Sequence, residues 1–202
     1  LSGVLLAEDR EYVTPLGVSL RQEPLPFDFD ALEPHFDAAT LKMHHATHHL
    51  HIVKKLDETL KEMRLDVGNL VALMPDIRTL VLPPDPLRKT VRMGGPPEKA
   101  SLAMQNALRV YGGAHINHTA FWRFLAPPGT SPKGPEGKVA QAICDEFGTV
   151  DEFRRAFTDA AMRHFGSGWA WLVYRPDGSL VIATTQNEDN PLMTDFVIPA
   201  KR

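Results

Sequence analysis

Cysteine is almost absent from this chain of 202 residues, because Cys144 is the only one. One thiol cannot form a disulfide within the chain, so no covalent cross-link holds the fold together. No basic residue adjoins Cys144 in the sequence, and the surrounding residues 139–147 have helical periodicity. We therefore expect this thiol to be buried and chemically inert.

The chain also lacks long apolar runs and a strong excess of charge of one sign. Its longest early apolar stretch, residues 4–7, is far too short to cross a bilayer or form the core of a signal peptide. The formal net charge of −3 argues against a nucleic-acid partner. We expect a soluble protein without membrane or nucleic-acid partners. It begins with Leu1 rather than Met, which is compatible with removal of an upstream segment, and its compartment is undefined.

The composition is that of a globular protein, with 43% hydrophobic and 23% charged residues. Changes in pattern along the chain predict three parts. Residues 1–26 form an irregular arm, and residues 27–126 form a helical domain with a proline-rich insertion at 82–100. Residues 127–202 form an α/β domain that is incomplete at its end.

The helical domain is predicted from side chains spaced three and four residues apart. Asp37 can cap a helix that ends near residues 66–68. One stripe of this helix contains Leu41, His44, His48, Ile52, Leu56, Leu60 and Met63. A short helix is expected at 70–74 and a long one at 101–122. The paired Gly112 and Gly113 inside the long helix indicate that another backbone approaches it closely.

The last part combines helices and strands, so the fold class is α+β. We expect helices at 139–146 and 150–165, the second capped by Thr149 together with Glu152. A switch to alternating periodicity predicts a hairpin of residues 169–175 and 179–185. A third strand of the small antiparallel sheet is expected at 196–198, where it is truncated.

Histidines suggest the chemistry of this protein. His44 and His48 are four residues apart and can converge on one side of a helix, while His118 lies on a second helix. Neutral imidazole is a good ligand for iron, manganese or zinc, so we expect a metal site. A surface histidine run without a metal is the alternative. A zincin site is excluded, because His45 stands where its glutamate should follow the first histidine.

Four segments in order resemble the iron/manganese superoxide dismutases. They are LPFDFDALEPHFDAATLKMHHATHH (25–49), GGAHINHTAFW (112–122), FGSGWAWLVYRPDGSLVIATT (165–185) and QNEDNPL (186–192). The resemblance implies a helical hairpin followed by an α/β lobe with a three-stranded antiparallel sheet. It also implies one iron or manganese ion per subunit between these parts, superoxide as substrate, and a homodimer.

The resemblance further implies roles for individual residues. His44 and His118 match two metal ligands, and His48 matches a histidine beside the substrate entrance. Glu188 matches a glutamine that acts on bound solvent and is counted with His48 as catalytic. The aromatic residues that match rings packed around the site are Phe121, Trp122, Trp169 and Trp171.

The sequence departs from the family pattern at three places. The D-x-W-E-H-A-Y-Y motif, which carries the family's other two ligands, does not occur in the 202 residues. Ile52 replaces the usual active-site tyrosine, and Glu188 replaces glutamine, with Ala114 at the position of the iron-type glutamine. We favour the interpretation that this chain is a fragment of a longer protein whose remaining residues carry the motif. Otherwise Glu188 or Asp189 supplies a carboxylate ligand.

Two other functions remain open from the sequence. A non-catalytic superoxide-dismutase-like protein with a structural or partner-binding role would explain the absent motif and Ile52. A histidine-rich metal store or sensor would bind exchangeable metal without turnover. The metal content of the purified protein discriminates between the enzyme and the non-catalytic relative.

Overall fold

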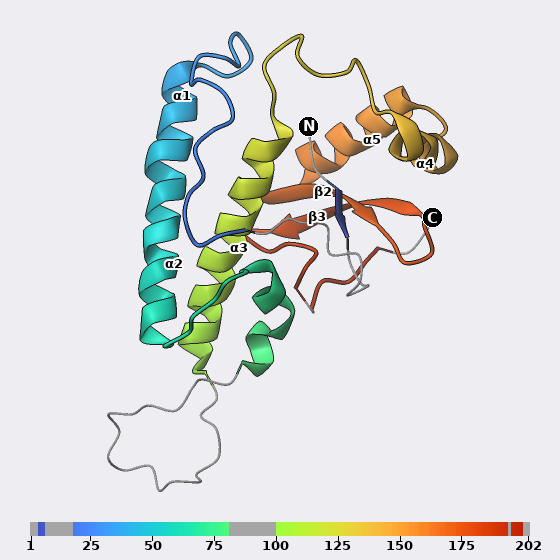
Figure 1. Cartoon of the computed structure of the whole chain (residues 1–202). Coiled ribbons are helices and arrows are strands. Elements are labelled where there is room, and N and C mark those ends of the chain that lie inside the picture. Colours follow the sequence, from blue (N-terminus) through green and yellow to red (C-terminus); the bar gives the residue numbers. More distant parts are fainter. Residues whose placement is uncertain (1–3, 7–17, 81–99, 194, 200–202) are drawn as a thin grey trace, which may run out of the picture.

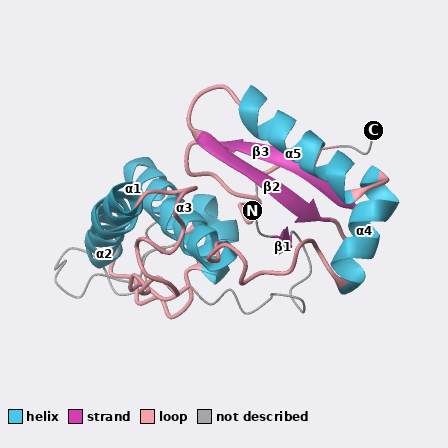
Figure 2. Cartoon of the chain, turned by 90° about the horizontal axis from the view of Figure 1, so that it is seen from above, coloured by secondary structure: helices cyan, strands magenta, loops and turns pink. Residues whose placement is uncertain are grey.

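A computed structural model of the chain describes residues 4–6, 18–80, 100–193 and 195–199 (Figure 1). A pair of long antiparallel helices lies beside a small sheet, and two shorter helices cover the face of the sheet that points away from this pair (Figure 2). The predicted proline-rich insertion at 82–100 lies outside the described residues, apart from residue 100.

The first long helix is continuous but contains a change of winding. Asp37 caps it as predicted, because its carboxylate accepts a hydrogen bond of 2.8 Å from the backbone N–H of Thr40. The helix has three consecutive sections, which are α1 (Ala38–Met43), the π-helix η1 (His44–His49) and α2 (Leu50–Glu62). The wider winding of η1 is visible in its backbone bonding, since the N–H of Leu50 donates to the carbonyl of His45.

This first helix is shorter than predicted. It ends at Glu62 rather than near residues 66–68. The reason is local, because Arg64 adopts a left-handed conformation with φ of 54°, and the N–H of Leu65 turns back to the carbonyl of Leu60. A 3-10 helix, η2 (Val71–Thr79), follows and continues through Pro75, beyond the predicted end at residue 74.

The second long helix, α3 (Leu102–Phe124), packs against α2 (Figure 1). Ser101 caps it by accepting a hydrogen bond from the N–H of Met104. A Cβ atom added at Gly113 would collide with the backbone carbonyl of Glu188. The close backbone approach that the paired glycines predicted is therefore confirmed at Gly113, where it brings the segment after the sheet against the helix.

The sheet contains the predicted hairpin. Strands β2 (Gly168–Tyr174) and β3 (Leu180–Gln186) pair antiparallel, with Gly168 opposite Gln186 and Tyr174 opposite Leu180. Side chains alternate between two cores, as expected for a sheet covered on both faces. Trp171 and Val173 face the segment around Leu192, whereas Leu172 packs with residues of the two covering helices.

Those covering helices are α4 (Gly137–Phe147) and α5 (Val150–Arg163) (Figure 2). Thr149 caps α5 as predicted, because its hydroxyl oxygen accepts from the N–H of Glu152 at 3.1 Å. Cys144 lies on α4 with an exposed side chain, so the prediction of a buried thiol is wrong. The predicted helix is correct, but Cys144 faces solvent, whereas its neighbour Ile143 lies on the buried face of the same helix.

The third strand is not where the sequence placed it. Residues 195–199 have no strand conformation, because the N–H of Phe196 is used in a turn with the carbonyl of Met193. The edge of β2 instead pairs in parallel with β1 (Val4–Leu6), a segment predicted to be irregular. The order of the sheet is β1-β2-β3. In the described part of the chain, no helix is both long enough and apolar enough to span a bilayer.

Candidate metal centre

Three histidines from two helices meet between the helical pair and the sheet. His44 and His48 come from η1, and His118 comes from the middle of α3. One nitrogen from each ring belongs to a set whose members all lie within 4.8 Å of one another. Among the described residues, these three are the only group of histidine, cysteine and acidic side chains brought together in this way.

The hydrogen bonds of these rings leave nitrogens available to an ion. His118 has its Nδ1 2.7 Å from the carbonyl of Ala114. A carbonyl only accepts, so Nδ1 carries the proton and Nε2 keeps its lone pair. His44 and His48 make no side-chain hydrogen bond with the described residues. This arrangement resembles a ligand shell, in which a histidine donates one N–H to the protein and offers the other nitrogen to a metal.

Burial favours the neutral form of two of these histidines, His118 and His44. Burial lowers the pKa of His118 to about 4, and the hydrogen bond to Ala114 opposes this only in part. Burial and then the proximity of His48 lower the pKa of His44. Neutral imidazole is the form that binds metals, so the environment favours the ligand state.

Aromatic rings surround the three histidines. Trp122 packs its ring edge-to-face with His44 at 4.9 Å, and Trp169 packs in the same way with His118 at 5.2 Å. Phe121 lies 6.0 Å from both His44 and Trp169. Trp171 instead stacks on Trp169 at 5.9 Å. Three of the four predicted aromatic residues therefore contact the histidines directly, and Trp171 contacts them only through Trp169.

Glu188 approaches the cluster from the loop after β3. Its carboxylate accepts a hydrogen bond of 3.1 Å from the indole N–H of Trp169. Burial raises the pKa of Glu188, and the bond from Trp169 opposes that rise. The Glu188 backbone is held as well, because the amide of Asn117 donates to its carbonyl at 3.1 Å. The charge of Glu188 interacts with His48, although its oxygens lie outside the 4.8 Å histidine set.

Asp189, the other carboxylate considered as a ligand, points elsewhere. Both of its oxygens accept hydrogen bonds of 2.7 Å from the Arg109 guanidinium. Such a bidentate pair satisfies the carboxylate and fixes its orientation. The alternative in which Asp189 joins the site is therefore wrong in this structure, and Glu188 is the carboxylate near the histidines.

Two further histidines belong to this region, although the sequence analysis did not choose them. His49 is 1% exposed and His115 is fully buried, and the Nε2 of His49 lies 2.8 Å from the Nδ1 of His115. A signal for them was present. His45 and His49 repeat the four-residue spacing of His44 and His48, and His115 lies three residues before His118.

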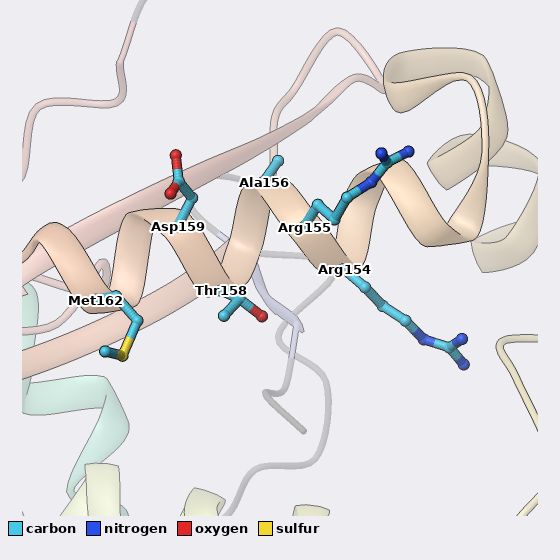
Figure 3. Close-up of a pocket in the computed structure, with 6 residues that line it drawn as sticks. All are labelled: Arg154, Arg155, Ala156, Thr158, Asp159 and Met162. Carbon is cyan, nitrogen blue, oxygen red and sulfur yellow. The ribbon is translucent and has the colours of Figure 1, made fainter.

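Another concave surface lies along α5 and does not resemble a site. Its lining residues all belong to this one helix, and their side chains spread to both sides of it instead of converging (Figure 3). They are Arg154, Arg155, Ala156, Thr158, Asp159 and Met162. Arg154 and Arg155 donate to Asp151 of the same helix.

Comparisons with known families match both parts of the chain. The alpha-hairpin domain of iron/manganese superoxide dismutases matches residues 20–80. The C-terminal domain of the same proteins matches residues 135–200. The first range contains His44 and His48, and the second contains Trp169 and Glu188.

Curated relatives agree with these matches. The chain is 40% identical over 173 residues to the protein named superoxide dismutase [Mn] 1 of Leptolyngbya boryana, an alignment that covers 86% of this chain and 61% of that protein. It is 38% identical to a superoxide dismutase [Mn] of Pseudomonas aeruginosa, over 84% of this chain and 73% of the relative. It is also 38% identical to a superoxide dismutase [Fe] of Raoultella planticola, over 84% of this chain and 86% of that protein.

Proposed function

The chain belongs to the iron/manganese superoxide dismutase family, and we propose that it converts superoxide to oxygen and hydrogen peroxide at one iron or manganese ion. The observation that carries the proposal is the convergence of His44, His48 and His118 under a cover of aromatic rings. In the balanced reaction, two superoxide ions and two protons give one O₂ and one H₂O₂.

His44 and His118 would hold the ion. Both are neutral rings with lowered pKa values, and each has a nitrogen that no described residue occupies. Iron and manganese accept imidazole ligands, so the donor set fits either metal. When bound, the ion would supply one-electron chemistry by alternating between its +3 and +2 states.

The remaining residues would control access and water. His48 is exposed, which suits a side chain beside the substrate entrance. Phe121, Trp122 and Trp169 would shield His44 and His118 from bulk water, and this would strengthen electrostatic interactions inside the site. Glu188, held by Trp169, would place a carboxylate near the histidines and could act on solvent there.

Family membership also supports the division of the chain and its assembly. We assign residues 27–126 to the hairpin domain and residues 127–202 to the α/β domain, which lie on either side of the proposed ion. A homodimer is expected by the same resemblance, and sedimentation of the purified protein measures it directly.

One observation favours a second candidate, a non-catalytic relative with a structural or partner-binding role. Ile52 is 6% exposed and lies one helical turn after His48, so no hydroxyl group occupies that position. A non-catalytic protein would fold fully without iron or manganese. Metal analysis of protein from cells grown with both metals therefore separates the candidates.

The test of the enzyme is removal of one proposed ligand. In His118→Ala and His44→Ala, bound iron or manganese and superoxide consumption should both fall at least 100-fold, while circular dichroism remains that of the wild type. His51→Ala is the matched control, because His51 is an exposed histidine on the same helix. An active His118→Ala protein would overturn the proposal.

Glu188→Ala tests whether the carboxylate is also a ligand. If Glu188 coordinates the ion, the metal content of Glu188→Ala should fall as far as that of His44→Ala. Unchanged metal content in Glu188→Ala, under conditions where His44→Ala loses its metal, would restrict Glu188 to an interaction with solvent.

A further inference from the structure

A row of hydrogen bonds runs from Trp122 through two buried histidines to the N-terminal segment. The indole N–H of Trp122 donates to the Nδ1 of His49 at 3.1 Å. The Nε2 of His49 lies 2.8 Å from the Nδ1 of His115, and the Nε2 of His115 lies 2.7 Å from the carbonyl of Ser19. The row therefore joins η1, α3 and the segment that precedes α1.

The chemistry of the two ends fixes every proton in this row. A backbone carbonyl only accepts, so Nε2 of His115 carries a proton, and Nδ1 of a neutral His115 is then an acceptor. His49 must donate to that acceptor through Nε2. An indole N–H only donates, so Nδ1 of His49 must accept from Trp122. Both histidines are thus neutral Nε2–H tautomers, and the donors all point from Trp122 toward Ser19.

His49 also touches the residues that hold the proposed ion. Its ring stacks on His118 with centroids 5.2 Å apart and an angle of 22° between the planes. Through its bond to Trp122 it fixes an indole that packs against His44 at 4.9 Å. A single buried side chain therefore contacts one proposed ligand and orients the ring that packs on the other.

The amide of Gln22 gives His49 a second fixed neighbour. It lies 3.4 Å from the Nδ1 of His49 and donates to the carbonyl of His45 at 2.6 Å. His45 in turn has its Nε2 3.0 Å from the carbonyl of Glu23. The segment of residues 19–23 is thus fastened to η1 by the side chains of Gln22, His45 and His49. Its Ser19 carbonyl supplies the acceptor that determines the direction of the row.

We propose that His49 is a positioning residue for the metal centre, and that the Trp122–His49–His115–Ser19 row holds it in the single tautomer this task needs. The inference rests on the proposed function, because it assumes that His44 and His118 bind the ion. His49 itself needs no contact with the ion. It acts by stacking on the His118 ring and by holding the Trp122 indole through a hydrogen bond, so that both keep fixed angles, the role that outer neighbours of metal ligands serve.

The test compares two substitutions of His49 in the full chain, loaded with cobalt(II) as a spectroscopic probe. Glutamine can accept from Trp122 and donate to His115, whereas leucine can do neither. We expect His49→Leu to weaken cobalt binding about 10- to 100-fold and to shift the visible ligand-field bands. His49→Gln should retain most of the wild-type affinity and spectrum. Iron and manganese content on purification should follow the same order.

A stability control separates positioning from general damage. Leu56→Ala removes a fully buried side chain from the aliphatic core, at a residue that takes no part in the hydrogen-bonded row. It should lower the unfolding midpoint without changing cobalt affinity or ligand-field bands. If His49→Leu binds cobalt with wild-type affinity and spectrum, the inference is overturned while the metal site stands.

The tautomers are measured separately, by nitrogen-15 NMR of the metal-free full chain. Protons on Nε2 of both His49 and His115, with scalar coupling across their shared hydrogen bond, are the expected result. An Nδ1–H tautomer at either residue would overturn the inference. Wild-type protein that binds no cobalt, iron or manganese would instead overturn the proposed function and, with it, the role of His49 in positioning a metal.

Discussion

The carboxylate of Glu188 is joined to the site by a hydrogen bond from the indole N–H of Trp169. Their bond of 3.1 Å connects the loop after β3 to the ring that packs on His118. Both side chains are half-buried, so neither group can recover all of its hydrogen bonding from water if the other is lost. The pair therefore couples the position of Glu188 to that of Trp169.

Replacing Glu188 in two ways tests this coupling. Glu188→Gln keeps an acceptor oxygen for Trp169 and should change the free energy of unfolding of the metal-free protein by less than about 0.5 kcal/mol. Glu188→Leu leaves the indole N–H without its partner and should destabilise by about 1–2 kcal/mol. Urea unfolding followed by tryptophan fluorescence measures both. Equal destabilisation in the two variants would contradict the coupling.

At the scale of secondary structure, much of the molecule follows from spacing and capping residues. Asp37, Ser101 and Thr149 each accept from the third residue after them, and such local bonds are readable in a sequence. The β-hairpin could be predicted equally well, because two segments of alternating apolar and polar residues are separated by residues typical of a turn. The i, i+4 spacing of His44 and His48 also predicted their proximity, and their rings lie 5.6 Å apart.

Features that depend on partners elsewhere in the chain were not predictable. The π-helix extends over only six residues. Histidines four residues apart lie on one face of an α-helix and of a π-helix alike, so their spacing cannot distinguish the two. The edge of β2 is occupied by β1, more than 160 residues earlier, so no local pattern near residues 196–198 could reveal it. Asp189 was a possible ligand in sequence, but Arg109 of α3 determines its direction.

The two glycines of α3 provide a prediction about how the helix meets the segment after the sheet. Gly113→Ala should destabilise by about 3 kcal/mol or more, because the new methyl group meets the Glu188 carbonyl, a backbone atom that cannot move alone. It should also displace Glu188 and weaken binding of added manganese. Thermal unfolding and manganese titration measure these effects.

Gly112→Ala is the matched control. Its methyl group would lie 2.9 Å from the end of the flexible Met74 side chain, which can shift. Alanine also gains about 1 kcal/mol over glycine inside a helix, so the net change should be near zero or stabilising. If both variants lose the same stability, the backbone contact at Gly113 is not what requires glycine.

At the scale of the whole molecule, the helical pair and the sheet meet around buried neutral histidines. Burial lowers the pKa of His49 to about 2 and that of His118 to about 4, and it lowers the pKa of His115 as well. The unfolded chain binds protons at these residues near pH 6.5, whereas the native chain does not. Their contribution to stability is therefore complete above about pH 6.5 and is lost progressively as the pH falls toward 4.

Acid should thus unfold the metal-free protein early. For each proton that only the unfolded state binds, the free energy of unfolding falls by about 1.4 kcal/mol for every pH unit of acidification. Between pH 6 and 4.5 we expect unfolding to take up more than one proton, so the slope should be steeper than this value. His49→Gln should reduce that slope, because it removes one of the buried histidines. Urea unfolding in the presence of a chelator measures the slope. Equal stability at pH 7.5 and 5 would contradict the neutral histidine core.

The solvent-exposed thiol on α4 has a practical consequence. Since Cys144 is the chain's only cysteine, a maleimide reagent should attach one nitroxide or fluorophore per chain without further engineering. Its helix carries none of the histidines discussed above, so the tag would not disturb them. Paramagnetic broadening of the nitroxide by a loaded ion would then measure its separation from the label, which gives a ruler for locating that ion in solution.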